Sequence, residues 1–177
     1  SWTIGLVIPR TVNYFFRDPF FNYLTEGIAQ ACNQNNYTLA FFLIGNKEDE
    51  EKTFPRVSRR GLLDGIILQS GQLGDPLFDR LVASNIPLVI AGRPFHAEGV
   101  SYIDVDNVAA AVMAVNHLIS LGYHRIGAIS GPFNNIVTQD RRDGYIKALV
   151  EANLPIEEGL ISEGDYTEQG GYHAMQR

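Results

Sequence analysis

The chain has 177 residues, of which 45% are hydrophobic and 19% charged, and 20 acidic against 14 basic side chains give a formal net charge of −6. This composition is typical of a globular protein with one sizeable core, and the acidic excess argues against a nucleic-acid-binding surface. The single cysteine, Cys32, excludes an intrachain disulfide, and no apolar run approaches the roughly 20 residues of a membrane helix, so the cytoplasm is the simplest compartment.

Short apolar runs rich in β-branched and aromatic residues predict buried parallel strands. In chain order they cover residues 4–8, 37–44, 65–69, 87–91 and 125–130, with a weaker run at 100–105. Helical patterns fill the segments between them. This alternation predicts an α/β fold, a doubly wound parallel sheet with helices flanking both faces.

Capping residues mark the helices. A side-chain acceptor, followed in two cases by proline at the first helical position, predicts helix starts at Asp18-Pro19, Asp75-Pro76 and Asp106. Gly122 should end the third of these helices. A further helix is predicted over residues 138–152, and another over residues 48–60 that Pro55 should kink or split.

Binding sites in such a sheet lie beyond the carboxyl ends of the strands. The loops expected there hold aromatic rings, amides and arginines, without a paired general acid and base, and span residues 9–18, 69–74, 91–99 and 130–140. They favour binding over catalysis. The sequence has no phosphate-loop, dinucleotide, nucleophile-elbow or H-E-x-x-H motif, so we expect no cofactor. Asp104 and Asp106 could hold a cation, but capping explains Asp106 more simply, and we expect no metal.

A family resemblance rests on segments that follow one another along essentially the whole chain. They are IGLVIP, DPFFNYLTEGIAQAC, RRGLLDGIIL, PLVIAGRP, DVDNVAAAVMAVNHLISLGYHRIGAISGP, DRRDGYIKALVEANLP and EGDYTEQGGYHAMQR. In this order they resemble the effector-binding core of the lactose-repressor (LacI/GalR) family of bacterial transcription regulators. The fifth segment is the most specific.

The resemblance implies a periplasmic-binding-protein-like type I fold, in which two α/β subdomains bind a small sugar-like effector between them. We expect the N-terminal subdomain over residues 1–157 and an incomplete C-terminal subdomain over residues 158–177, with a strand at 160–163 and a helix at 167–177. The family also implies a homodimer, without membrane contact, that binds operator DNA through a helix-turn-helix head preceding this segment. We therefore expect a truncated core.

Effector contacts are implied at the positions that match the family, namely Phe20, Phe21, Gln69, Arg141 and Tyr166. Arg141 matches an arginine whose guanidinium can donate two parallel hydrogen bonds. Tyr166 matches an aromatic platform that stacks on the ligand ring. Phe20 and Phe21 match a pair of residues that lines the effector pocket in the family. Gln69 matches a polar position after the third strand.

Alternatives remain at the level of residues and of function. Arg141 could pair with Asp140 or Asp143, Tyr166 could pack at the hinge, and both phenylalanines fit the apolar stripe of their helix. A periplasmic sugar-binding protein of an ABC-type transporter is the alternative function, while a small enzyme lacks a nucleophile–base pair. In the family that the chain resembles, the position of Gly92 is often an aspartate that accepts a hydrogen bond from a ligand hydroxyl. The resemblance therefore does not determine the identity of the effector.

Overall fold

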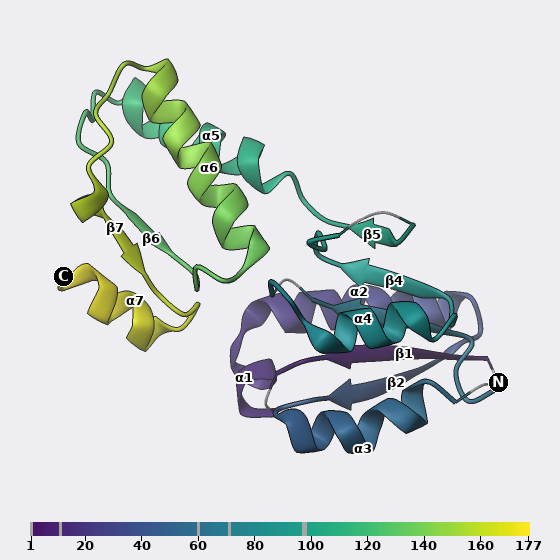
Figure 1. Cartoon of the computed structure of the whole chain (residues 1–177). Coiled ribbons are helices and arrows are strands. Elements are labelled where there is room, and N and C mark those ends of the chain that lie inside the picture. Colours follow the sequence, from purple (N-terminus) through teal and green to yellow (C-terminus); the bar gives the residue numbers. More distant parts are fainter. Residues whose placement is uncertain (1, 11, 60, 71, 97–98) are drawn as a thin grey trace. The chain divides into compact units, whose positions relative to one another are not determined.

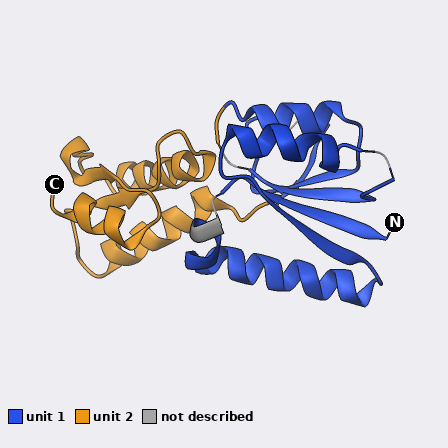
Figure 2. Ribbon diagram, turned by 90° about the horizontal axis from the view of Figure 1, so that it is seen from below, with its two compact units in different colours: residues 1–70, 74–103 blue, residues 71–73, 104–177 orange. Residues whose placement is uncertain are grey.

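The structure is a computed structural model, which describes residues 2–10, 12–59, 61–70, 72–96 and 99–177. It divides the chain into two compact units (Figures 1 and 2). Unit 1 comprises Ser1–Ser70 and Gly74–Ile103, and unit 2 comprises Gly71–Leu73 and Asp104–Arg177. Residues 11, 71, 97 and 98, which fall in the loops expected to hold ligand contacts, lie outside the described residues.

Unit 1 is built on a five-stranded parallel sheet in the order β2-β1-β3-β4-β5. Its strands are β1 (Thr3–Ile8), β2 (Thr38–Leu43), β3 (Gly65–Gln69), β4 (Leu88–Ala91) and β5 (Ser101–Ile103). The central strands are the apolar runs of the sequence, because both of their faces are covered. The predicted parallel α/β sheet is confirmed.

Helices cover both faces of this sheet (Figure 2). They are α1 (Val12–Arg17), α2 (Pro19–Gln34), α3 (Lys47–Val57) and α4 (Pro76–Ala83). Alternation along β1 sends Leu6 and Ile8 into the core under α1 and α2, and Val7 into the core under α3 and α4. Unit 1 is therefore doubly wound.

The predicted helix starts are confirmed by their hydrogen bonds. The Asp18 carboxylate accepts from the amide of Phe20 at 2.9 Å, and the Asp75 carboxylate accepts from the amide of Leu77 at 3.0 Å. The helix that contains Pro55 does not split: it continues from Lys47 to Val57, and the proline lies two residues before its end.

One helix of unit 1 was not predicted. The segment 9–18, expected as a loop, contains the six-residue helix α1. Its Phe15 is only 5% exposed and packs on Phe21, with ring centroids 5.7 Å apart. Tertiary packing of one aromatic side chain therefore accounts for a helix too short to show a period of its own.

Unit 2 contains a separate parallel strand pair, β6 (Ala128–Ser130) and β7 (Ile161–Glu163). Its helices are α5 (Asn107–Ser120), α6 (Ile136–Glu151), the 3-10 turn η1 (Glu158–Leu160) and α7 (Glu168–Met175). The helices α5 and α6 pack side by side, with α7 on the other side of the strands (Figure 1). Val115, Ala148 and Leu149 form the core between strands and helices.

The helices α5 and α6 approach closely at Gly144. A Cβ at this position would lie 2.3 Å from the carbonyl oxygen of Val108 and 2.8 Å from the Cβ of Ala111. Only glycine allows the two backbones to pack at this distance. Asp106 caps α5 by accepting from the amide of Ala109 at 2.8 Å, and Gly122 follows its C-cap with a φ of +88°, both as predicted.

The two units divide at a different place from the boundary expected after residue 157. The strand predicted at 125–130 was assigned to the first subdomain, but β6 pairs with β7 and not with the first sheet. The helices α5 and α6 pack on this second pair, so unit 2 begins at Asp104 and not at residue 158. An apolar strand shows by its composition that it is buried, but not in which sheet.

Candidate functional site

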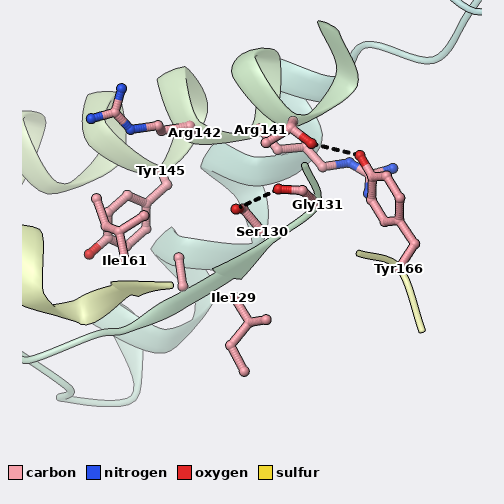
Figure 3. A pocket seen from close by; sticks show the side chains of 10 residues that line it. Ile129, Ser130, Gly131, Arg141, Arg142, Tyr145, Ile161 and Tyr166 are labelled. Carbon is pink, nitrogen blue, oxygen red and sulfur yellow. Dashed lines mark hydrogen bonds between the residues drawn. The ribbon is translucent and has the colours of Figure 1, made fainter. Parts of the chain in front are cut away.

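A cavity of about 160 Å³ lies within unit 2, between α6 and the strands (Figure 3). It runs along β6 from Ala128 and reaches Gly131 and Tyr166 beyond the carboxyl ends of the strands, the edge at which parallel sheets hold their ligands. The strands, the first turns of α6 and the loop before α7 line it, with the side chains of Ala128, Ile129, Ser130, Gly131, Thr138, Arg141, Arg142, Tyr145, Ile161 and Tyr166. Two of the predicted site residues, Arg141 and Tyr166, therefore meet at one cavity.

Arg141 is an exposed residue on α6 whose guanidinium is anchored at one nitrogen. Its Nε donates to the amide oxygen of Asn107 at 3.0 Å, and not to the carboxylates considered above. The buried amide of Asn107 in turn donates to Asp104 Oδ1 at 3.3 Å and to the carbonyl of Val105 at 3.1 Å. No further hydrogen bond or ion pair of Arg141 involves a described residue, so its terminal NH2 groups can donate to a ligand.

Tyr166 lies in the loop between β7 and α7, with 40% of its surface exposed. Its hydroxyl shares a hydrogen bond of 2.7 Å with the hydroxyl of Thr138 (Figure 3). The phenol end of the ring is thus bound to α6 while part of the ring remains accessible. An exposed aromatic face beside guanidinium donors suits a polyhydroxylated ring, whose C–H face stacks and whose hydroxyls accept.

Tyr145 closes the opposite end of the cavity from Tyr166 (Figure 3). It is 4% exposed, and its hydroxyl donates to the carbonyl of Ile126 at 2.8 Å. Burial, followed by the nearby carboxylates of Glu157 and Glu158, raises the pKa of the Tyr145 phenol above its ordinary value. This ring is therefore a neutral wall of the cavity at physiological pH.

The remaining predicted contacts lie in unit 1. Phe20 is 53% exposed at the start of α2. Phe21 is 2% exposed and belongs to the core, in agreement with the alternative that it lies on the apolar stripe of its helix. Gln69 ends β3, and its buried Oε1 has no hydrogen-bond partner among the described residues. Phe20 and Gln69 thus follow the carboxyl ends of strands β1 and β3, where ligand contacts are expected.

The backbone at Gly92 leaves no room for a side chain. Its φ is +110°, and a Cβ there would lie 2.8 Å from the carbonyl oxygen of Ser70. A side chain would therefore collide with the neighbouring backbone. The close approach of the two strand ends thus requires glycine here, and this edge has no carboxylate at residue 92.

Two residues that organise the cavity were missed by sequence reasoning. Asn107 was given no role in the site, and Thr138 was only the first residue of the helix predicted over residues 138–152. They are 3% and 2% exposed, and each bonds the functional group of a predicted contact residue. The sequence around such a polar residue does not show that its side chain bonds to a contact residue, because the partner lies 28 to 34 residues away.

The described residues offer no cluster of three or more histidine, cysteine, aspartate or glutamate side chains that could hold a metal ion. Asp106 caps α5, and Asp104 accepts from the amide of Val105 at 2.8 Å. None of the helices within the described ranges has the length and apolar content needed to cross a bilayer.

Comparison with known proteins places these features in a family. Residues 1–177 match the family described as periplasmic binding proteins and sugar binding domain of LacI family. The chain is 31% identical over 176 residues to the HTH-type transcriptional regulator CelR of Thermobifida fusca, covering 98% of this chain and 52% of that protein. It is 32% identical over 180 residues to the HTH-type transcriptional regulator AglR of Rhizobium meliloti, covering 100% and 49%.

Solved structures agree with these relatives. A structure described as a transcriptional regulator CelR–cellobiose complex matches with a TM-score of 0.93 and 30% identity, over 99% of this chain and 54% of that one. A regulatory protein of the LacI family from Chloroflexus aggregans matches with a TM-score of 0.82 and 26% identity, over 98% and 61%. The chain spans about half the length of the curated relatives it matches.

Proposed function

Because this chain belongs to the family of periplasmic binding proteins and sugar-binding domains of LacI-type proteins, we propose that it is effector-binding core sequence of a bacterial LacI-type transcription regulator. The observation that carries this proposal is similarity over the whole chain to transcriptional regulators, including one solved with cellobiose. These relatives are transcriptional regulators and not enzymes.

The proposed effector is a small sugar. The chemistry of the unit 2 cavity supports it, since the accessible ring of Tyr166 can stack on a sugar face and the terminal nitrogens of Arg141 can donate to its hydroxyls. Phe20 and Gln69 are proposed as further contacts from unit 1. Phe21 remains a predicted contact, although its burial supports a core role more directly.

Effector binding is proposed to change the affinity of the regulator for DNA. Effector binding would close the two subdomains by a hinge motion, and a homodimer would transmit the change to helix-turn-helix heads on operator DNA. The HTH-type names of the relatives support this proposal. Such a regulator would act in the cytoplasm.

The test is titration calorimetry of the complete gene product with a panel of sugars that begins with cellobiose. Arg141→Ala should weaken binding by about 2 kcal/mol, roughly 30-fold, because it removes a charged donor. Arg125→Ala is the matched control, since this arginine is exposed in the same unit and pairs only with Glu157 in the described chain. Absence of sugar binding, or equal affinity of the Arg141 variant, would count against the proposal.

The alternative, a periplasmic sugar-binding protein, shares the family description. The coding sequence ahead of this segment distinguishes the two. A helix-turn-helix there supports the regulator, whereas a secretory or lipoprotein signal supports the transporter component. The HTH-type relatives favour the regulator.

A further inference from the structure

The backbone of Tyr166 is held in an unusual conformation. Its φ is +64°, in the left-handed region that non-glycine residues rarely adopt. Such a conformation persists where the surroundings impose it, and it is frequent at ligand-binding sites. The contacts around Tyr166 show what imposes it here.

The chain on either side of Tyr166 is fixed by a turn. One carboxylate oxygen of Asp165 accepts from the amide of Thr167 at 3.0 Å and from its hydroxyl at 2.6 Å. Thr167 also caps α7 by accepting from the amide of Gly170 at 2.9 Å. Tyr166 is thus set between a side-chain-stabilised turn and the first turn of a helix.

The ring itself rests against backbone. A Cβ on Gly131 would lie 2.0 Å from Cζ and 2.3 Å from the hydroxyl oxygen of Tyr166. The end of the ring therefore lies directly over the glycine at the end of β6, and no larger residue could occupy that position without displacing the ring.

The hydroxyl completes the restraint. It lies 2.7 Å from the hydroxyl of Thr138, and it donates to the side-chain oxygen of Asn135 at 3.4 Å. Thr138 and Asn135 are 2% and 7% exposed, and Asn135 is the N-cap of α6. With the phenol proton directed to Asn135, the Thr138 hydroxyl can donate to the phenol oxygen. Two buried partners on one helix thus hold the polar end of the ring.

We propose that Thr138 is a positioning residue that holds Tyr166 in its ligand-stacking orientation before a sugar arrives. The inference rests on the proposed function, because it assigns the Tyr166 ring as the stacking surface. The phenol end is bonded to α6 and lies against Gly131, while 40% of the surface of Tyr166 stays exposed. A side chain ordered in advance loses no rotamer freedom on binding, which increases affinity.

The binding experiment is a double-mutant cycle in the complete gene product, titrated with cellobiose or the tightest sugar of the panel. Thr138→Val should weaken binding about fivefold, as loss of one buried hydrogen bond does, and Tyr166→Phe at least as much, because it also removes the bond to Asn135. The double variant should bind no more weakly than Tyr166→Phe, because that change already removes the bond to Thr138. Thr138→Ser retains the hydroxyl and should recover most of the affinity.

Thr25→Val is the matched control. It makes the same substitution at a buried hydroxyl that has no hydrogen-bond partner among the described residues, and it should leave affinity unchanged. Wild-type affinity in both Thr138→Val and Tyr166→Phe would overturn the proposal, as would losses that add in the double variant. A loss shared equally by Thr25→Val would also overturn it.

A measurement without ligand keeps this inference separate from the proposed function. In protein labelled with 3-fluorotyrosine, the 19F resonance of Tyr166 is the one that Tyr166→Phe removes. It should be single and sharp in the wild type, and shifted or broadened in Thr138→Val. If no sugar binds while this change is seen, the positioning holds and the proposed function fails. An unchanged resonance in Thr138→Val overturns the positioning role.

Discussion

Replacing Gly144 with alanine tests the packing of α5 against α6. The new Cβ would meet the Val108 carbonyl oxygen at 2.3 Å, whereas ordinary contact begins at 3.4 Å, so α5 would have to move by about 1 Å. Overpacking of this kind costs up to about 3 kcal/mol, and alanine recovers about 1 kcal/mol of helix propensity. We expect Gly144→Ala to lower the free energy of unfolding by about 2 kcal/mol.

The assay is urea denaturation followed by circular dichroism, with hydrogen exchange of the α5 and α6 amides to locate the loss in unit 2. Gly27→Ala is the matched control, because Gly27 lies inside α2 and an added Cβ would meet nothing within 4 Å. It should stabilise unit 1 by about 1 kcal/mol. Equal or higher stability of Gly144→Ala would refute the close approach of the helices.

Three further predictions concern titration and a buried amide. Burial raises the pKa of Tyr145 above 10.0, so its contribution to stability is complete below pH 10 and is lost as the pH rises through the raised pKa. Above pH 10 the urea midpoint of Tyr145→Phe should therefore fall less steeply with pH than that of the wild type. Parallel curves of midpoint against pH for the two proteins would contradict this. The hydroxyl and amide of Thr167 lower the pKa of Asp165 below 3.8, so this carboxylate contributes stability above about pH 4 that is lost as the pH falls through the lowered pKa. Thr167→Val should raise that pKa in a carbon NMR titration, and an unchanged value would argue against the turn. Asn107→Asp keeps an acceptor oxygen but removes the donor to Asp104, and it should lower the melting temperature; Asp104→Asn added to it should restore part of the loss, and no recovery would contradict the pairing.

The elements of the fold could be predicted from local chemistry. The Asp-Pro pairs at residues 18 and 75 determine where α2 and α4 begin, and the carboxylates accept the amide bonds expected of them. Apolar runs predicted the strands of unit 1, which are three to six residues long. These signals suffice because each depends on neighbours within one turn or on alternation within one strand.

Long-range arrangement could not be predicted in the same way. The strand at β6 has the composition of the strands before it, yet its partner is β7, 33 residues further on in register. The resemblance identified the family but not where the chain passes from one unit to the other. The correction at Asp104 rests on strand pairing and helix packing, neither of which leaves a local pattern.

The residues of the candidate site also fall into those that could be predicted from the sequence and those that could not. Arg141 and Tyr166 could be identified because each matches a family motif, and the structure brings them to one cavity. Their anchors, Asn107 and Thr138, are buried polar residues whose role exists only through a distant partner. The motif thus indicated two residues that line one cavity, whereas the residues that bond to them could be found only from the structure.

The helix α6 presents different faces to the cavity and to α5. Thr138, Arg141 and Tyr145 are spaced by three and four residues and share the face that lines the cavity, while Gly144 faces α5. Because these faces divide the helix, its apolar residues form no single stripe. Gly144 should therefore change stability alone, whereas Tyr145, which is both cavity wall and core, should change stability and affinity together. Arg141 should act mainly on affinity, with a smaller loss of stability because its Nε bonds to buried Asn107.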